Sequence, residues 1–330
     1  MDQPRQTQST GLIGEVMRLL KIIPQNTSIP FLSIRKVALI FSLVLVLSSL
    51  ASWAFIGLNT GIDFRGGFLV EIRSKSGPAD IQALRQQLGV LDLGDISLQE
   101  FGVETDVLIR VQSQNLEDSE SLSDVDKAAV VLIQSTLGEE YTIRRTEYVG
   151  AVVGSELRQK ALWAIVAAIG AIMIYIWFRF EWPFAVSAII ALCHDVITTV
   201  GLFSITGFEF NLATVAALLT IAGYSINDTV VVFDRVRDNL KRFKSLSIPE
   251  ILNISLNETL NRTIMTSVTT LIALISISIF GGAVLGDFAL AMTWGILIGT
   301  YSSIFVAVAT LVWFDLTPDD EDVPTPEYER

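Results

Sequence analysis

Asp228 is the residue of this 330-residue chain whose type and position most favour chemistry. It lies beside Asn227 inside a long apolar run, with five further residues before the charged pair Asp234 and Arg235. A carboxylate at that depth in a membrane costs roughly 2.5 to 3.5 kcal/mol, so it should face protein or water and not lipid. Such a group can bind and release a proton. The sequence therefore favours a functional role for this carboxylate over the alternative, a structural hydrogen bond between packed helices.

The neighbours of Asp228 predict a polar face on one helix. With helical spacing, Thr220, Tyr224 and Asn227 share a face, and Gly223 and Asp228 lie close beside it. We call these five residues the polar seam. Tyr224 and Asn227 are accordingly candidates for the same proton pathway.

A second ionisable pair, His194 and Asp195, lies within another apolar run. His194 is the only histidine of the chain. A histidine side chain can change its charge in the physiological pH range, so this pair is a candidate proton relay. The sequence supports equally well the alternative that His194 bonds to a neighbouring helix.

The chain lacks the usual sequence signs of an enzyme. No nucleophile-elbow motif, metal-ligand spacing or Walker lysine is present, and the single Cys193 lies in a hydrophobic segment. The glycines of Gly61–Gly67, G-I-D-F-R-G-G, are therefore expected to form a turn into a strand and not a phosphate loop. We expect a protein that is not an enzyme and that has no cofactor and no metal.

Composition places these residues in a membrane. Hydrophobic residues make up 51% of the chain, charged residues 18%, and the mean hydropathy is +0.53. These values exclude an ordinary soluble domain. The net charge is -12, but most acidic residues lie in 92–147 and in the tail, where they are typical of a solvated surface. No basic stripe with interleaved aromatic residues is present, so no nucleic-acid partner is expected.

Six apolar runs are long enough to cross a bilayer, which takes about 20 residues. The first is longer than the apolar core of a signal peptide, so we expect it to be retained. Between the fourth and fifth runs, residues 247–261 show the spacing of an amphipathic helix, which is expected to lie at the membrane interface. The predicted spans are residues 37–58, 161–178, 184–205, 210–233, 263–280 and 288–314.

Residues 59–160 predict one folded domain between the first two spans. Alternating apolar residues indicate strands at 68–73, 96–101, 106–111 and 141–149, and helical spacing indicates helices at 79–88 and 122–137. Strand, helix, strand, strand, helix, strand is the order of the ferredoxin-like split βαβ unit. The predicted fold is therefore an α-helical polytopic membrane protein with six transmembrane helices and one α+β ferredoxin-like domain outside the cytoplasm.

The Lys and Arg residues predict the orientation. Those at Arg35, Lys36, Arg179 and in the segment 235–262 all lie on one side, and the short connections 206–209 and 281–287 contain none. The positive side is normally cytoplasmic. We therefore expect a cytoplasmic N-terminal segment 1–36, a periplasmic domain 59–160, a five-helix bundle 161–314 and an acidic cytoplasmic tail 315–330.

Three motifs resemble a known family. The G-I-D-F-R-G-G segment is similar to the signature of the SecD and SecF subunits of the bacterial Sec translocase. The H-D-V at His194–Val196 and the G-Y-S-I-N-D-T-V-V-V-F-D-R at Gly223–Arg235 resemble the SecF branch of that family. The resemblance covers about residues 35–315.

The resemblance implies an auxiliary subunit that uses the proton-motive force, together with SecD, to promote protein translocation across the bacterial inner membrane. It further implies the SecYEG channel and the unfolded preprotein as partners. In this family the residues matching Asp228 and Arg262, at the start of the fifth span, are implicated in proton conduction. The sequence alone favours a topology anchor for Arg262. A proton-coupled exporter of small molecules or lipids, from the related resistance-nodulation-division superfamily, is the alternative function.

Overall fold

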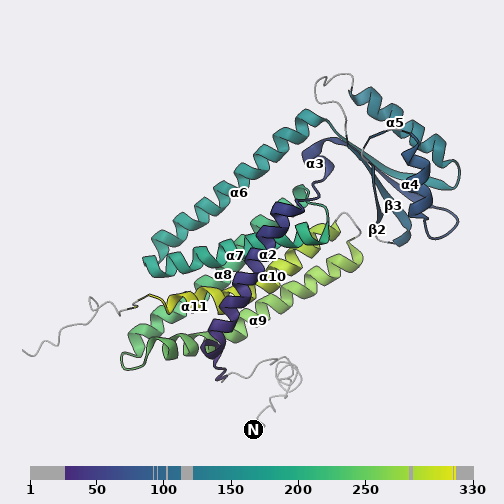
Figure 1. Cartoon of the computed structure of the whole chain (residues 1–330). Coiled ribbons are helices and arrows are strands. Elements are labelled where there is room, and N and C mark those ends of the chain that lie inside the picture. Colours follow the sequence, from purple (N-terminus) through teal and green to yellow (C-terminus); the bar gives the residue numbers. More distant parts are fainter. Residues whose placement is uncertain are drawn as a thin grey trace, which may run out of the picture.

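The computed structural model contains a helical bundle with an α+β domain at one end (Figure 1). Its described residues are 27–91, 93–94, 96–101, 103–112, 122–281, 285–314 and 316. Within them, six helices are long and apolar enough to cross a membrane, as predicted. They are α2 (Arg35–Phe55), α6 (Ala151–Arg179), α7 (Trp182–Thr206), α8 (Leu212–Arg242), α9 (Ile248–Phe280) and α10 (Gly286–Ser302). The 3-10 turn η1 (Phe31–Ile34) precedes α2. The last span, α10, continues through the π-helical turn η3 (Ser303–Ala307) into α11 (Val308–Leu311).

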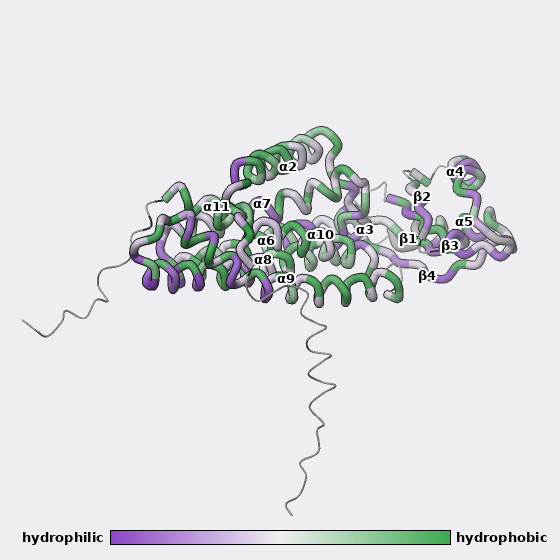
Figure 2. The backbone as a smooth tube through the Cα atoms, turned by 90° about the horizontal axis from the view of Figure 1, so that it is seen from below, coloured by the Kyte–Doolittle hydropathy of each residue, from purple (hydrophilic) through white to green (hydrophobic). Residues whose placement is uncertain are grey.

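Hydropathy follows this arrangement. Figure 2 shows hydrophobic residues along the middle of the bundle helices and hydrophilic residues in the α+β domain and at the opposite ends of the helices. Exposed large side chains such as Val37, Leu162 and Ile275 lie on the outside of these helices. They are suited to contact lipid.

The prediction of a separate amphipathic helix at 247–261 is wrong, because α9 runs without interruption from Ile248 to Phe280. A capping box begins this helix, with the Glu250 carboxylate accepting hydrogen bonds from Ser247 N (2.9 Å) and Ser247 Oγ (2.8 Å). The apolar face does not lie on a membrane surface. Leu252 and Leu256 are buried against the extension of α8, in the same hydrophobic cluster as Val236.

Polar contacts also join α8 and α9 at this end. Arg235 Nε lies 2.7 Å from Glu258 Oε2, and Asn239 Nδ2 donates to Ser255 Oγ at 3.0 Å and to Glu258 Oε2 at 2.6 Å. The basic segment after the predicted fourth span is therefore the last part of α8 and not a loop. The two helices form a hairpin that extends beyond the hydrophobic middle of the bundle.

The α+β domain has the predicted ferredoxin-like order. Its elements are β1 (Gly67–Ser74), α4 (Ile81–Gly89), β2 (Ile96–Phe101), β3 (Val103–Gln112), α5 (Leu122–Leu137) and β4 (Tyr141–Val149). The sheet order is β2-β3-β1-β4 and every neighbouring pair is antiparallel. One face of the sheet packs on α4 and α5 through Val70, Leu84 and Ile133. The other face packs on the short helix α3 (Ile62–Arg65) through Leu69 and Leu108.

Charged residues on the second face of the sheet form an ion-pair cluster. The buried Asp106 carboxylate accepts hydrogen bonds from Arg73 Nε (2.5 Å), Arg73 Nη2 (2.6 Å) and Arg144 Nη1 (3.1 Å). The hydrogen bonds from Arg73 lower the pKa of Asp106, and burial opposes them. The cluster fixes the register of β1 against β3, where Arg73 lies opposite Asp106.

The glycine-rich segment forms the predicted turn into the first strand. Gly66 and Gly67 have φ values of 76° and 124°, which side chains other than glycine rarely adopt, and β1 starts directly after α3. Asp63 contributes to the bundle, because its Oδ2 accepts a hydrogen bond from Leu212 N (3.0 Å) at the start of α8. The segment therefore joins the domain to the bundle.

A buried ion pair makes a second connection between the two parts. Arg110 of β3 pairs with Glu209, in the connection between α7 and α8, and the two side chains are only 11% and 8% exposed. Nearby backbone hydrogen bonds join Gly61 N to Phe210 O (3.0 Å) and Phe210 N to Asn59 O (2.8 Å). Burial raises the pKa of Glu209, and the charge of Arg110 acts against this shift.

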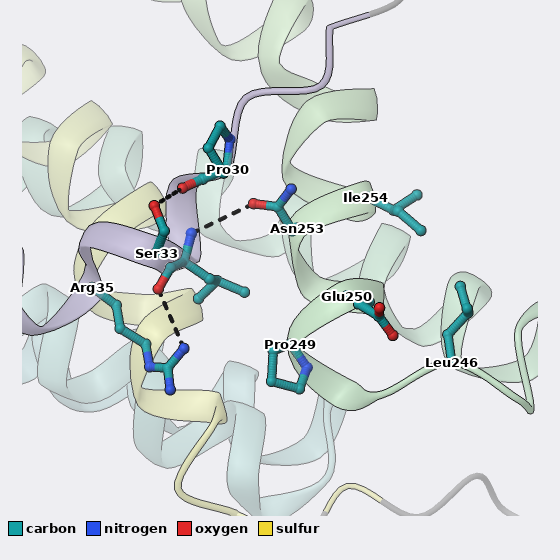
Figure 3. A pocket seen from close by; sticks show the side chains of 9 residues that line it. Pro30, Ser33, Arg35, Leu246, Pro249, Glu250, Asn253 and Ile254 are labelled. Carbon is teal, nitrogen blue, oxygen red and sulfur yellow. Dashed lines mark hydrogen bonds between the residues drawn. The ribbon is translucent and has the colours of Figure 1, made fainter.

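At the opposite end, the segment before α2 is held on α9. Asn257 accepts a hydrogen bond from Ile29 N (2.8 Å) and donates one to Ile29 O (2.9 Å), and Asn253 accepts one from Leu32 N (3.4 Å). Figure 3 shows the pocket of about 430 Å³ between this segment and α9. The pocket is wide open, and no ionisable group of the polar seam lines it.

Candidate functional site

Asp228 is buried in the bundle on the side of α8 that faces α9. Only 3% of the residue is exposed, and Oδ2 of its carboxylate has no hydrogen-bond partner among the described residues. The groups of α9 that act on the carboxylate are the Thr266 hydroxyl, by a hydrogen bond, and the Arg262 charge. Asp228 therefore faces protein and not lipid, in agreement with the prediction.

Arg262 lies in the middle of α9 and not at a helix end. Its side chain is exposed, and no ion pair within 4.0 Å joins it to Asp228. Because the helix continues on both sides, the helix-end position that favoured a topology anchor is absent. The arrangement instead places a cation beside a buried carboxylate without direct contact, so a small shift between α8 and α9 would change their interaction strongly.

Tyr224 extends the polar contacts between α8 and α9 by one turn. Its hydroxyl donates to Ser267 Oγ at 3.3 Å, and Ser267 Oγ lies 2.6 Å from Thr300 Oγ1 of α10. Thr263 Oγ1 is also buried and has no partner among the described residues. Hydroxyl groups from three helices thus lie along one path near Asp228.

The residues of the predicted polar seam do not share one face of α8. Tyr224 and Asp228 face α9, whereas Thr220, Gly223 and Asn227 are exposed on the outside of α8. Asn227 consequently does not share the buried environment of its neighbour Asp228. Asn227 instead lies on an exposed face of α8.

Asp195 forms a separate polar site between α7, α8 and α10. It is fully buried, and Oδ2 accepts hydrogen bonds from Ser225 Oγ (2.5 Å) and Ser302 Oγ (2.7 Å). Oδ1 lies 2.9 Å from His194 Nδ1. Asp195 and His194 could be identified from the sequence, but Ser225 and Ser302 could not, because no spacing rule relates residues on three different helices.

His194 extends this site toward α2. Its Nε2 is buried without a partner among the described residues, and its ring centroid lies 6.1 Å from that of Tyr301. The Tyr301 hydroxyl lies 2.9 Å from Ser42 Oγ and donates to Ala38 O at 2.8 Å. His194 therefore has one nitrogen beside a carboxylate and the other without a partner among the described residues.

Small residues on α10 bring these groups together. A Cβ atom at Gly295 would overlap Ile221 of α8, and one at Gly299 would come within 3.2 Å of Ser225 Cβ. The small residues that repeat every fourth position in the sixth span therefore face α8 of the same chain. This close approach places Ser302 beside Asp195, and Ser303 Oγ 3.0 Å from Thr229 Oγ1.

The chemistry that these groups support is proton exchange. Two buried carboxylates, one histidine and a set of hydroxyl groups lie in the bundle, and no cluster of three His, Cys, Asp or Glu side chains suited to a metal ion is found in the described residues. Within the described residues, Asp228 has one carboxylate oxygen without a hydrogen-bond partner, whereas both oxygens of Asp195 have partners. The better candidate for a proton that binds and leaves is therefore Asp228.

Comparison with known proteins shows consistent relationships. Residues 130–317 match the family described as protein export membrane protein SecD/SecF, C-terminal. Protein translocase subunit SecF of Cereibacter sphaeroides is 45% identical over 298 residues, covering 87% of this chain and 90% of that protein. The SecF subunit of Rickettsia bellii is 42% identical over 298 residues, covering 89% of this chain and 96% of that protein.

Solved structures agree. The crystal structure of SecDF, a translocon-associated membrane protein from Thermus thermophilus, matches with a TM-score of 0.77 and 34% identity. The match covers 91% of this chain but 41% of that one. This chain thus has the length of the SecF relatives and corresponds to less than half of SecDF.

Proposed function

Because the chain belongs to the SecD/SecF family of protein translocase subunits, we propose that it acts in protein export as the SecF-type subunit of a Sec translocase. Names of the relatives indicate a translocase subunit and give no support to the alternative, a small-molecule or lipid exporter. The six apolar helices agree with an integral membrane subunit. The proposal for its mechanism is that proton movement through the bundle assists translocation.

The observation that supports this mechanism is that the Asp228 carboxylate is buried and incompletely hydrogen-bonded. A buried carboxylate with one oxygen free of partners among the described residues offers a position where a proton can bind, and the Arg262 cation acts on it from beyond ion-pair distance. Movement of α9 relative to α8 would change the distance to Arg262 and thereby the proton affinity. Each proton that crosses a potential of 100 mV supplies about 2.3 kcal/mol, which is sufficient to bias two positions of the α+β domain.

Asp195 and His194 are proposed as a second part of the proton pathway. Ser225 bonds to Asp195 and precedes Asp228 by about one turn of α8, so the two carboxylates lie near the same part of that helix. Tyr224, beside Ser267 and Thr300, lines the path near Asp228. Asn227, on the outside of α8, is proposed to face another subunit.

The proposed orientation puts both termini in the cytoplasm and the α+β domain in the periplasm of a bacterial inner membrane. The proposed partners are SecD, the SecYEG channel, associated membrane factors and the translocating preprotein. Support comes from the Lys and Arg residues at the helix ends opposite the domain. Cysteines introduced at Ser76 and Lys244 of a Cys193→Ser chain should label from the outside and the inside, respectively. Labelling of both from one side would contradict the orientation.

The test of the mechanism is Asp228→Asn, which keeps the size of the side chain and removes the titration. We expect the variant chain to fold and to associate with SecD. Export in cells that carry it should be no better than in cells without the chain, and should no longer respond to the proton gradient. The matched control is Asp234→Asn, on the same helix, where the carboxylate is exposed and pairs with Arg179 at 2.8 Å. This control should export normally, because exposed ion pairs contribute about 0 to 1 kcal/mol.

Normal export by Asp228→Asn, with a normal response to collapse of the gradient, would contradict the assignment of Asp228. A parallel test of Asp195→Asn then distinguishes the second site. Loss of response in Asp195→Asn alone would transfer the proton site to the Asp195 and His194 pair.

A further inference from the structure

An apolar cavity of about 470 Å³ lies between α2, α6, α7 and α8, next to the α+β domain and apart from both carboxylate sites. Trp53, Leu162 and Val200 are among its lining residues. Figure 1 shows α6 at the edge of the bundle, and within the described chain it contacts α3, α7 and α8. The part of α7 between α2 and α6 is therefore only partly covered.

The cavity lies in the half of the membrane-spanning helices next to the α+β domain. It reaches from Thr60 and Leu58, near the domain, to Val196 on α7, and α7 ends at Thr206. Ten residues of helix between Val196 and Thr206 span about 15 Å. This is half of the hydrocarbon thickness of about 30 Å.

Arg158 of α6 is the one charged residue that lines this cavity. The other lining residues are apolar or carry a hydroxyl group. Its side chain is exposed, and it has no ion pair or hydrogen bond to any residue in the described part of the chain. The nearby acid on the same helix, Glu156, pairs with Lys160 at 3.1 Å. At the same end of the cavity, the Thr60 hydroxyl accepts a hydrogen bond from Arg65. Unpaired positive charge therefore lies at the domain end of an apolar cavity.

We propose that this cavity binds one phospholipid from the leaflet next to the α+β domain, with an acyl chain between α2 and α6 and its phosphate on Arg158. An apolar interior suits an acyl chain, because burial removes its CH₂ groups from water. A guanidinium binds phosphate oxygens with two parallel hydrogen bonds. Trp53, half-exposed beside the cavity, suits the region of the headgroups.

The proposal has a structural consequence. α6 begins against α3, where a Cβ atom at Gly154 would come within 2.9 Å of Gly66 N. A lipid between α2 and α6 would therefore hold α6, and with it the end of β4, at a defined distance from α7. This inference depends only on the chain spanning a membrane, and not on the proposed proton site.

The test is native mass spectrometry of the full chain, released from detergent micelles after addition of palmitoyl-oleoyl phosphatidylglycerol. We expect one retained lipid per chain. Arg158→Gln should weaken retention about ten-fold, which corresponds to about 1.4 kcal/mol. Arg158→Lys should retain most of the binding, and Lys160→Gln, two residues away outside the cavity, should bind like the parent chain.

The acyl part of the site is tested separately by Val200→Phe, which places a larger side chain in the cavity. It should lower retention at least ten-fold, whereas Ile190→Phe, an exposed residue of α7 outside the cavity, should have no effect. Dioleoylglycerol, which lacks the phosphate, should bind at least ten-fold more weakly. Glycerol phosphate, which lacks the acyl chains, should not compete.

Three results would overturn the proposal. Equal retention in Arg158→Gln, Val200→Phe and the controls would show nonspecific lipid adhesion. Equal binding of dioleoylglycerol would exclude the assignment to Arg158. Loss of the lipid when a partner subunit associates with the parent chain would show that a protein helix, and not a lipid, covers the cavity.

Discussion

At the scale of residues, the two buried carboxylates differ in how they are satisfied. Asp195 has neighbours for both oxygens, contributed by His194, Ser225 and Ser302, whereas Asp228 keeps one oxygen without a described partner. Full satisfaction makes a buried polar group rigid and costly to remove. A partly satisfied group can change its protonation with less rearrangement.

This difference predicts different effects on stability. Asp195→Ala leaves two hydroxyl groups and an imidazole without their acceptor, and we expect it to lower the free energy of unfolding by about 2 to 4 kcal/mol. Asp228→Ala removes a carboxylate with fewer hydrogen bonds and should lower the free energy of unfolding by about 1 kcal/mol. Thermal unfolding of the purified variants in one detergent measures both. Equal losses would contradict the distinction between the two sites.

In the α+β domain, Asp106 predicts a dependence on pH. Its pKa is lower in the folded chain than the unfolded value of about 3.9. Its contribution to stability is therefore complete above about pH 5 and is lost as the pH falls below about 4, through the folded-state pKa. Amide exchange in β1 and β3 should be faster in Asp106→Asn than in the parent at pH 6. The difference should shrink toward pH 3, and a difference that grows in acid would contradict the assignment.

At the scale of elements, the site depends on how closely α10 approaches α8 and how α2 approaches α7. A Cβ atom at Gly201 of α7 would overlap Ser49 of α2, and one turn further Ser52 Oγ lies 2.7 Å from Ser204 Oγ. Small residues allow the helices to pack at short distance, where hydroxyl groups can bond across the interface. Glycine and serine therefore position the carboxylates without contacting them.

Gly295→Leu tests this packing. The new side chain would meet Ile221 and force α10 away from α8, so we expect a loss of at least about 3 kcal/mol and reduced export. Gly170→Leu on α6 is the matched control, because no atom lies within 4 Å of a Cβ atom at that position. Similar thermal stability of the two variants would contradict the close packing of α8 and α10.

At the scale of the whole molecule, the α+β domain must be coupled to the bundle if proton movement in the bundle is to change the position of the domain. Three contacts provide this connection, namely the Asp63 cap of α8, the backbone pairing at Phe210, and the buried Arg110 and Glu209 pair. All three involve the short connection between α7 and α8 or the first turn of α8. A shift of α8 would therefore reach the domain directly.

The buried ion pair offers the test. Arg110→Met alone leaves Glu209 buried without its cation and should destabilise the contact by about 3 kcal/mol. The double variant Arg110→Met with Glu209→Leu removes both charges, and most of the loss should be recovered. Limited proteolysis at the domain boundary and thermal unfolding measure the change. Additive losses in the double variant would show that the pair does not act as a unit.

The six spans, the order of the α+β domain, and the presence of Asp228, Asp195 and His194 within apolar runs could all be predicted from the sequence. These features depend on local periodicity and on the rarity of ionisable residues in apolar runs, which are properties of neighbours along the chain. The glycine turn before β1 could be predicted for the same reason.

Which side chains contact one another depends on helix packing and could not be predicted from the sequence. Ser302 lies 107 positions from Asp195 along the chain, and helix packing alone brings them together. Asn227 and Asp228 are adjacent in sequence, yet they point to opposite environments because one side of α8 is covered by α9 and the other is not. The continuous helix α9 was mispredicted as two elements, since the apolar face that suggested a membrane surface is buried against α8. Periodicity shows that a helix has an apolar face but does not identify what covers it.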